Sequence, residues 1–152
     1  MQPFPHHYVV VSSGTADGDV HLSSGPLPVL RSAPPTEFDG PGTRWSPETL
    51  LVAAASDCFI LTFRAIARAS NLVWTSLECE MRGTLDRVDG TTQFTRFDLH
   101  AWLTIPAETQ PEQARRLLAK AERSCLIANS LKAERALTVD VEVASSTRAA
   151  LG

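Results

Sequence analysis

The stretch SPETLLVAAASDCFILTFRAIARA, residues 46–69, decides the fold because it predicts one long helix. Ser46 is a preferred N-cap, Pro47 suits the first helical position, and Glu48 lies in the first turn, where the helix dipole favours a carboxylate. We expect the helix to end near Ala69. Its first half is apolar on almost every side, so the rest of the chain and a partner subunit are expected to cover it.

The chain on either side of this helix reads mainly as strands. Before it, three short apolar pieces are strand-like, at residues 8–11, 20–23 and 27–30. The proline- and glycine-rich segment 33–43 is too broken for a regular element. After the helix, Leu77, Cys79 and Met81 alternate with polar residues, which predicts a half-buried strand.

A hairpin turn at Asp89-Gly90 is expected to lead into a second long strand that ends at Ile105, with a slip in its alternation near Phe97. Helices follow at about 110–124 and 127–133, and a strand at 137–143 closes the sheet. This order predicts an α+β fold with mainly antiparallel pairing, in a single domain spanning 1–152 with its core at about 8–143.

Composition excludes several classes of function. The net charge of −3 gives no electrostatic reason to expect a nucleic-acid partner. No uninterrupted apolar run approaches the ~18 residues of a membrane span. The first residues lack a basic region and an apolar region, so we do not expect a signal peptide there. We therefore expect a cytoplasmic protein without a membrane partner. Its three cysteines cannot all be paired within the chain, and a reducing compartment would keep structural disulfides rare. The four histidines show no metal-ligand spacing with the cysteines, so neither a metal nor a cofactor is expected.

Two of the cysteines are candidates for thiol chemistry. Cys58 lies ~15 Å from the start of its helix, too far for the helix dipole to activate it, so it needs a nearby cation. Cys125 is expected at a junction between two helices, where free amides would stabilise a thiolate. Core packing is the competing interpretation of both. Cys79 fits the inward face of a strand and is expected to be a core residue.

Together these residues resemble the OsmC/Ohr family of osmotically induced and organic hydroperoxide resistance proteins. The first motif is Ser46-Pro47-Glu48-Thr49-Leu50, followed by an alanine-rich helix that contains Cys58 ten residues after Glu48. The second is Ala121-Glu122-x-x-Cys125, which leads into Asn129-Ser130-Leu131. The resemblance covers roughly residues 8–143.

The resemblance implies an intertwined homodimer in which antiparallel sheets wrap long central helices. It implies a thiol peroxidase that reduces organic hydroperoxides or hydrogen peroxide. Cys58 would become a sulfenic acid, Cys125 would resolve it as a disulfide, and a dithiol reductant of lipoamide or thioredoxin type would reset the pair. An arginine paired with Glu48 would hold the reactive thiolate. Because Glu48 is ~15 Å from Cys58 along the helix, we expect it to serve the partner's site.

The arginine itself is absent from both of its usual family positions. Residues 36–40 read TEFDG and residues 14–19 read GTADGD. Arg44 is the leading substitute, with Arg31 as the other candidate. The alternatives to a peroxidase are a non-catalytic dimer that binds an apolar ligand or senses redox state through its thiols, and a structural dimer with inert thiols.

Overall fold

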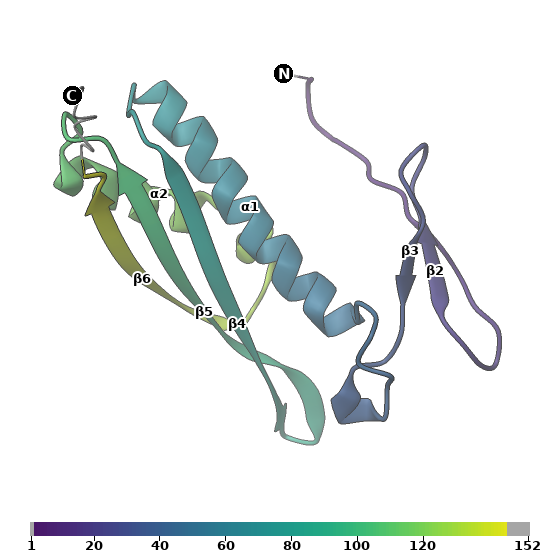
Figure 1. Ribbon diagram of the computed structural model, residues 1–152. Helices are drawn as coiled ribbons and strands as arrows, with labels where there is room; N and C mark the ends of the chain where they lie inside the picture. The colour runs from purple at the N-terminus through teal and green to yellow at the C-terminus, as the bar shows by residue number, and fades with distance from the viewer. Residues whose placement is uncertain (1, 146–152) are drawn as a thin grey trace, which may run out of the picture. The chain divides into compact units, whose positions relative to one another are not determined.

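The structure, a computed structural model, describes residues 2–145 and divides into two compact units that meet in sequence between Leu51 and Val52 (Figure 1). The prediction of a single domain over 1–152 stays a prediction.

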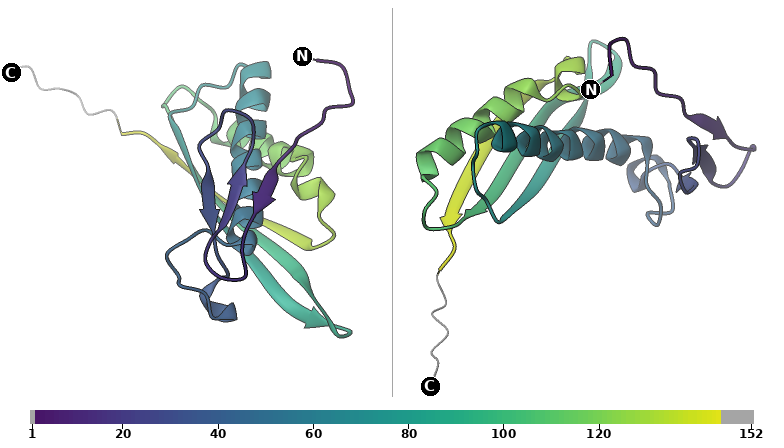
Figure 2. Two further views of the ribbon diagram at one scale, coloured as in Figure 1. Left: turned by 90° about the vertical axis from the view of Figure 1, so that its right-hand side faces the viewer. Right: turned by 90° about the horizontal axis from the view of Figure 1, so that it is seen from above.

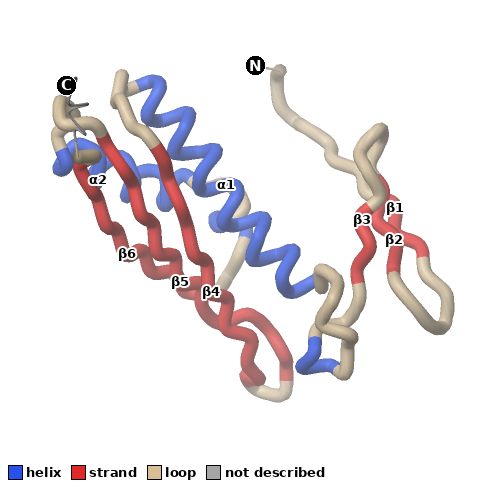
Figure 3. The backbone as a smooth tube through the Cα atoms, viewed as in Figure 1, coloured by secondary structure: helices blue, strands red, loops and turns tan. Residues whose placement is uncertain are grey.

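The first unit contains a small antiparallel sheet with the strand order β1-β2-β3. Its strands are β1 (Val11–Ser13), β2 (Val20–Ser23) and β3 (Leu30–Ser32), drawn in red in Figure 3. The prediction for β2 is confirmed, but the other two strands begin three residues later than predicted. Residues 8–10 have strand propensity, yet a strand needs a hydrogen-bonded neighbour, and within 2–145 these residues pair with none.

Helix α1 (Pro47–Ala69) has the predicted bounds. Its start is fixed by reciprocal capping. The Thr49 amide donates to Ser46 Oγ over 3.1 Å, and the Ser46 amide donates to Thr49 Oγ1 over 2.9 Å. Past its end, Asn71 takes a left-handed φ of 53°. One stripe of α1 is buried, at Ala55, Phe59, Phe63 and Ala67.

The second unit is built on the sheet β4-β5-β6. Strands β4 (Ser76–Val88) and β5 (Thr91–Ile105) form a long antiparallel hairpin through Asp89-Gly90, both of which have positive φ. The predicted slip in β5 is a register shift that leaves Thr95 without a cross-strand partner, two residues before Phe97.

The predicted mainly antiparallel pairing is confirmed for three of the four strand pairs, and the exception is strand β6 (Glu134–Val143), which runs parallel to β5. Helix α2 (Pro111–Ser124) carries the chain back along the sheet between the two strands, and such a crossover produces a parallel neighbour. Both helices cover one face of this sheet (Figure 2). The shared core consists of Phe59, Phe63, Ala67, Leu72, Leu99, Ala101, Leu103, Ile105, Ala114, Leu118 and Ala121.

Two connecting segments differ from the predictions, because each contains a short 3-10 helix. Thr36–Phe38 forms one inside the segment expected to lack regular structure. Ala128–Ser130 forms the other, where a helix over 127–133 was expected. The second prediction is wrong because Leu131 is already extended and β6 begins three residues later, which leaves no room for a full helix.

Helix α1 is also long and apolar enough, by length and composition, to cross a membrane, although it contains Glu48, Asp57, Arg64 and Arg68. The core helix of a globular protein meets the same two criteria, so the observation carries little weight. Its packing against the β4-β5-β6 sheet accounts for the apolar stripe.

Candidate active site

Cys58 lies in the middle of α1, one position before the core residue Phe59. Its side chain is partly buried, and its Sγ lies 3.9 Å from the hydroxyl of Thr62, one turn further along the helix. Helix positions four apart lie on the same face, so this contact between Cys58 and Thr62 forms within α1 itself.

Cys125 caps the end of α2 and is only 2% exposed. Its Sγ–H points at the backbone oxygen of Ala55, 3.8 Å away and one turn before Cys58. Burial raises the pKa of the Cys125 thiol to about 11. The amides of Ala128 and Ile127 act in the opposite direction, as predicted for a junction. Burial outweighs them, so the Cys125 thiol is protonated at neutral pH.

The structure brings the two predicted thiols together. Burial has the largest effect on the pKa of Cys125, and the amide of Ala128 has the second largest. The third comes from the neighbouring Cys58 thiol, which raises this pKa. Both cysteines are free thiols, contributed by two helices that pack in one core. Two adjacent free thiols can be joined by a two-electron oxidation.

A small pocket of about 20 Å³ opens beside Cys125. That is room for about one water molecule. Two side chains that carry charge at neutral pH, Glu122 and Arg135, line it. Its remaining wall is Ala55, Phe59, Met81, Phe97, Leu99, Cys125, Ala128, Leu131 and Ala136. The buried thiol therefore faces an apolar hollow with one ion pair at its edge.

The ion pair at this pocket joins α2 to β6. Arg135 Nε lies 3.1 Å from Glu122 Oε1, and both side chains are largely covered, at 28% and 20% exposure. Arg135 Nη1 also donates to Asn129 Oδ1 over 3.0 Å. Sequence reasoning missed Arg135. The available signal was its place in β6, where it occupies the inward register that Leu137, Val139 and Val141 continue.

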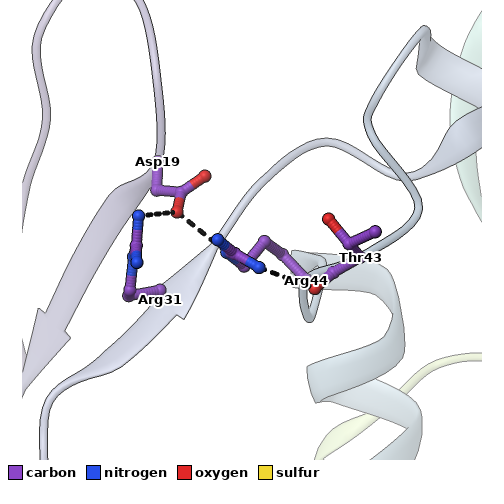
Figure 4. A network of polar contacts seen from close by, with 4 residues as sticks. All are labelled: Asp19, Arg31, Thr43 and Arg44. Atoms are coloured by element: carbon purple, nitrogen blue, oxygen red, sulfur yellow. Dashed lines mark hydrogen bonds and ion pairs between the residues drawn. The ribbon is translucent and has the colours of Figure 1, made fainter.

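Glu48 and the two candidate arginines all lie in the first unit. One carboxylate oxygen of Glu48 is buried and has no hydrogen-bond partner among residues 2–145. Arg44 and Arg31 instead bind the same carboxylate, that of Asp19, at 2.9 Å and 2.7 Å (Figure 4). The Arg44 hydrogen bond is the largest cause that lowers the pKa of Asp19.

Arg44 and Arg31 thus bind the same carboxylate, that of Asp19. Among residues 2–145, neither arginine forms an ion pair with Glu48. Arg44 also donates to the backbone oxygen of Thr43 over 3.0 Å. The pairing of Arg44 with Glu48 across a dimer stays a prediction.

Cys79 lies on the inner face of β4 and packs against the core, as predicted. Burial raises the pKa of its thiol to about 12. Within residues 2–145, no group of three or more histidine, cysteine, aspartate or glutamate side chains is placed to hold a metal ion.

The family model for OsmC-like proteins matches residues 40–142. A Bacillus subtilis (strain 168) protein named "Uncharacterized protein YmaD" is 25% identical over 143 residues, which cover 91% of this chain and 95% of that protein.

Solved structures share the fold, among them the following two. An OsmC-like protein of unknown function from Vibrio cholerae has a TM-score of 0.82 at 18% identity, covering 90% of this chain and 100% of that one. A Legionella pneumophila protein named as an organic hydroperoxide resistance protein OsmC has a TM-score of 0.72 at 23% identity, covering 93% and 100%. The α+β fold of this chain, with two α-helices and two three-stranded sheets among residues 2–145, matches OsmC-like structures.

Proposed function

Because the chain belongs to the family of OsmC-like proteins, we propose that it is a thiol-dependent peroxidase that reduces organic hydroperoxides or hydrogen peroxide. The observation that carries this proposal is the juxtaposition of the Cys58 and Cys125 thiols, of which Cys125 lines a mostly apolar pocket. The Legionella pneumophila protein of the same fold, named for organic hydroperoxide resistance, supports the substrate class.

The reaction needs only the two thiols, a peroxide and a dithiol. The Cys58 thiolate attacks one peroxide oxygen, the O–O bond breaks, and the leaving alkoxide takes up a proton as an alcohol or water. Cys58 is then a sulfenic acid. The Cys125 sulfur attacks it, a disulfide forms, and the sulfenic oxygen leaves as water with the Cys125 proton. A dithiol of lipoamide or thioredoxin type reduces the disulfide and becomes oxidised itself.

The roles differ because the surroundings of the two thiols differ. Cys125 is 2% exposed and protonated at neutral pH, so it is poorly suited to attack a peroxide first. Cys58 is only partly buried and is reached more readily by an incoming molecule. The proposal therefore assigns the first attack to Cys58 and resolution to Cys125.

A homodimer is part of the proposal. Along α1 only one stripe is buried, while Leu61 on the opposite side is 50% exposed. A second copy of the chain would cover this apolar side. In the dimer, Arg44 would bind Glu48 of the other chain, whose buried oxygen lacks a partner within 2–145, and would hold the Cys58 thiolate. Arg31 is the alternative arginine.

The second candidate function is a thiol redox sensor or an apolar-ligand binding module. One observation favours it: the pocket of about 20 Å³ has room for little more than a water molecule beside a protonated thiol. A slow thiol pair without peroxidase turnover would fit such a site.

Peroxide consumption distinguishes the two functions. The purified chain is mixed with cumene hydroperoxide or hydrogen peroxide and dihydrolipoamide, and the peroxide remaining is measured over time. We expect catalytic consumption that Cys58→Ser abolishes and Cys79→Ser leaves intact, with Cys58 and Cys125 joined in peptide maps. The assay is repeated with thioredoxin in place of dihydrolipoamide. If the chain is oxidised once and does not turn over with either reductant, the peroxidase is rejected in favour of the sensor.

A further inference from the structure

The segment that carries Cys125 is tied down from both of its sides by one arginine. Before Cys125, the last turn of α2 carries Glu122, whose carboxylate binds Arg135 at 3.1 Å. After Cys125, the 3-10 turn carries Asn129, whose Oδ1 accepts a hydrogen bond from the same guanidinium at 3.0 Å. Arg135 itself is on β6, next to the central strand of the sheet.

Asn129 extends this link to the backbone around the thiol. The backbone amide of Asn129 donates to the backbone oxygen of Cys125 over 2.9 Å. Its side-chain Nδ2 donates to the backbone oxygen of Arg123 over 3.1 Å. Glu122, on the other side, receives the Cys125 amide on its backbone oxygen at 3.3 Å. The position of Cys125 therefore depends on a set of contacts that meet at the Arg135 guanidinium.

We infer that Arg135, held by Glu122 and Asn129, is a positioning residue that keeps Cys125 opposite Cys58 while the disulfide forms. This inference rests on the proposed function. In that step the Cys125 sulfur bonds to the Cys58 sulfur, the S–O bond of the sulfenic acid breaks, and oxygen leaves as water. Arg135 neither gains nor loses a proton or an electron.

The physical reason is the geometry of thiol attack. Disulfides tolerate only a narrow range of Cα separations and dihedral angles, so a small displacement of Cys125 slows the reaction. Positioning errors of about 1 Å cost roughly 100-fold in rate. Planar guanidinium can bind a carboxylate and an amide oxygen at once, and an ammonium group does this poorly. The pair is also largely covered, which limits its screening by solvent.

The chain contains a matched control. Arg115 also joins α2 to β6, since its Nη1 donates to the backbone oxygen of Val139 over 3.1 Å. It is ten positions before Cys125 and does not line the thiol pocket. Arg115→Ala therefore removes an arginine tie between the same two elements without touching the Cys125 segment.

The test separates the two chemical steps in the full-length protein. After one equivalent of cumene hydroperoxide, rapid quenching with dimedone reports the Cys58 sulfenic acid, and peptide mapping reports the disulfide. We expect Arg135→Ala to lower the rate of disulfide formation relative to sulfenic acid formation by about 10- to 100-fold, so that the dimedone adduct accumulates. Arg115→Ala should leave this ratio within about twofold of the unmodified protein. Arg135→Lys replaces Arg135→Ala if the latter does not fold.

A second readout needs no peroxide. The equilibrium of the Cys58–Cys125 disulfide with a glutathione redox buffer should shift toward the dithiol by about 10-fold in Arg135→Ala, because positioning raises the effective concentration of the second thiol. If both arginine variants behave alike, Arg135 serves only to join α2 to β6 and the inference is overturned. If peroxide never oxidises Cys58 but the glutathione equilibrium still shifts, the proposed function fails and the inference stands. If no disulfide forms with either oxidant, both fall.

Discussion

Cys58 and Cys125 are neighbours with unequal environments, and that inequality decides which of them reacts first. The Cys125 thiol is covered on nearly all sides, and its pKa is raised to about 11. The Cys79 thiol in β4 has a pKa of about 12 for the same physical reason. At pH 8 each of these two thiols is a thiolate in about one molecule in a thousand or fewer.

We predict that iodoacetamide modifies Cys58 first, and Cys125 and Cys79 only as the pH approaches their raised pKa values. A buried thiol with a raised pKa favours the protonated folded state, so its contribution to folding is complete below about pH 9 and is lost as the pH rises through about 11. Mass spectrometry of alkylated peptides between pH 7 and pH 11 measures this order. Modification of Cys125 at pH 8 as fast as Cys58 would contradict it.

We also predict that Arg44 controls the reactivity of Cys58. Its replacement by alanine removes the cation that the proposal places beside the Cys58 thiolate, and we expect alkylation of Cys58 at pH 7 to slow by about 10-fold. Peroxide reduction should slow with it. Arg31→Ala is the paired variant, because both arginines bind Asp19. An effect from Arg31→Ala alone identifies Arg31 as the activating residue, and no effect from either removes the arginine from the mechanism.

At the scale of elements, strand β4 lies close to its neighbours at Gly83. A Cβ at this position would lie 2.8 Å from a side-chain carbon of Val52 on α1 and 2.8 Å from one of Phe94 on β5. Gly83→Ala is therefore expected to lower the free energy of unfolding by about 1–3 kcal/mol, as overpacking does. Gly14→Ala is the control, since its Cβ would meet Val20 at an ordinary 3.5 Å. Urea titrations of both variants provide the measurement, and equal midpoints would refute the close approach.

At the scale of the whole molecule, we predict a homodimer held by the exposed side of α1. Light scattering at micromolar concentration should give twice the chain mass of 16.5 kDa. Leu61→Glu places a charge on that side of α1 and should produce monomers. Leu126→Glu is the matched control, because Leu126 is also exposed, at 67%, but lies outside α1. A dimer that survives Leu61→Glu would place the interface elsewhere.

The sequence by itself determined the elements whose causes are local. The helix at Pro47–Ala69, the Ser46 cap and the Asp89-Gly90 turn were all predictable, since capping, apolar periodicity and turn propensity act over a few residues. It also indicated both family motifs and their cysteines. The predicted starts of the strands β1 and β3 were wrong, because pairing partners decide where a strand begins. The helix predicted at 127–133 was also wrong, because the chain is already extended at Leu131.

Only the tertiary structure decided the features that join distant parts of the chain. Parallel pairing of β6 with β5 depends on the path of α2. Cys58 and Cys125, 67 positions apart, become neighbours because two helices pack on one sheet face. In the sequence, Arg135 is one charge two residues before the strand predicted at 137–143. Its contacts with Glu122 and Asn129 exist because that strand lies beneath the end of α2, and no local pattern encodes such proximity.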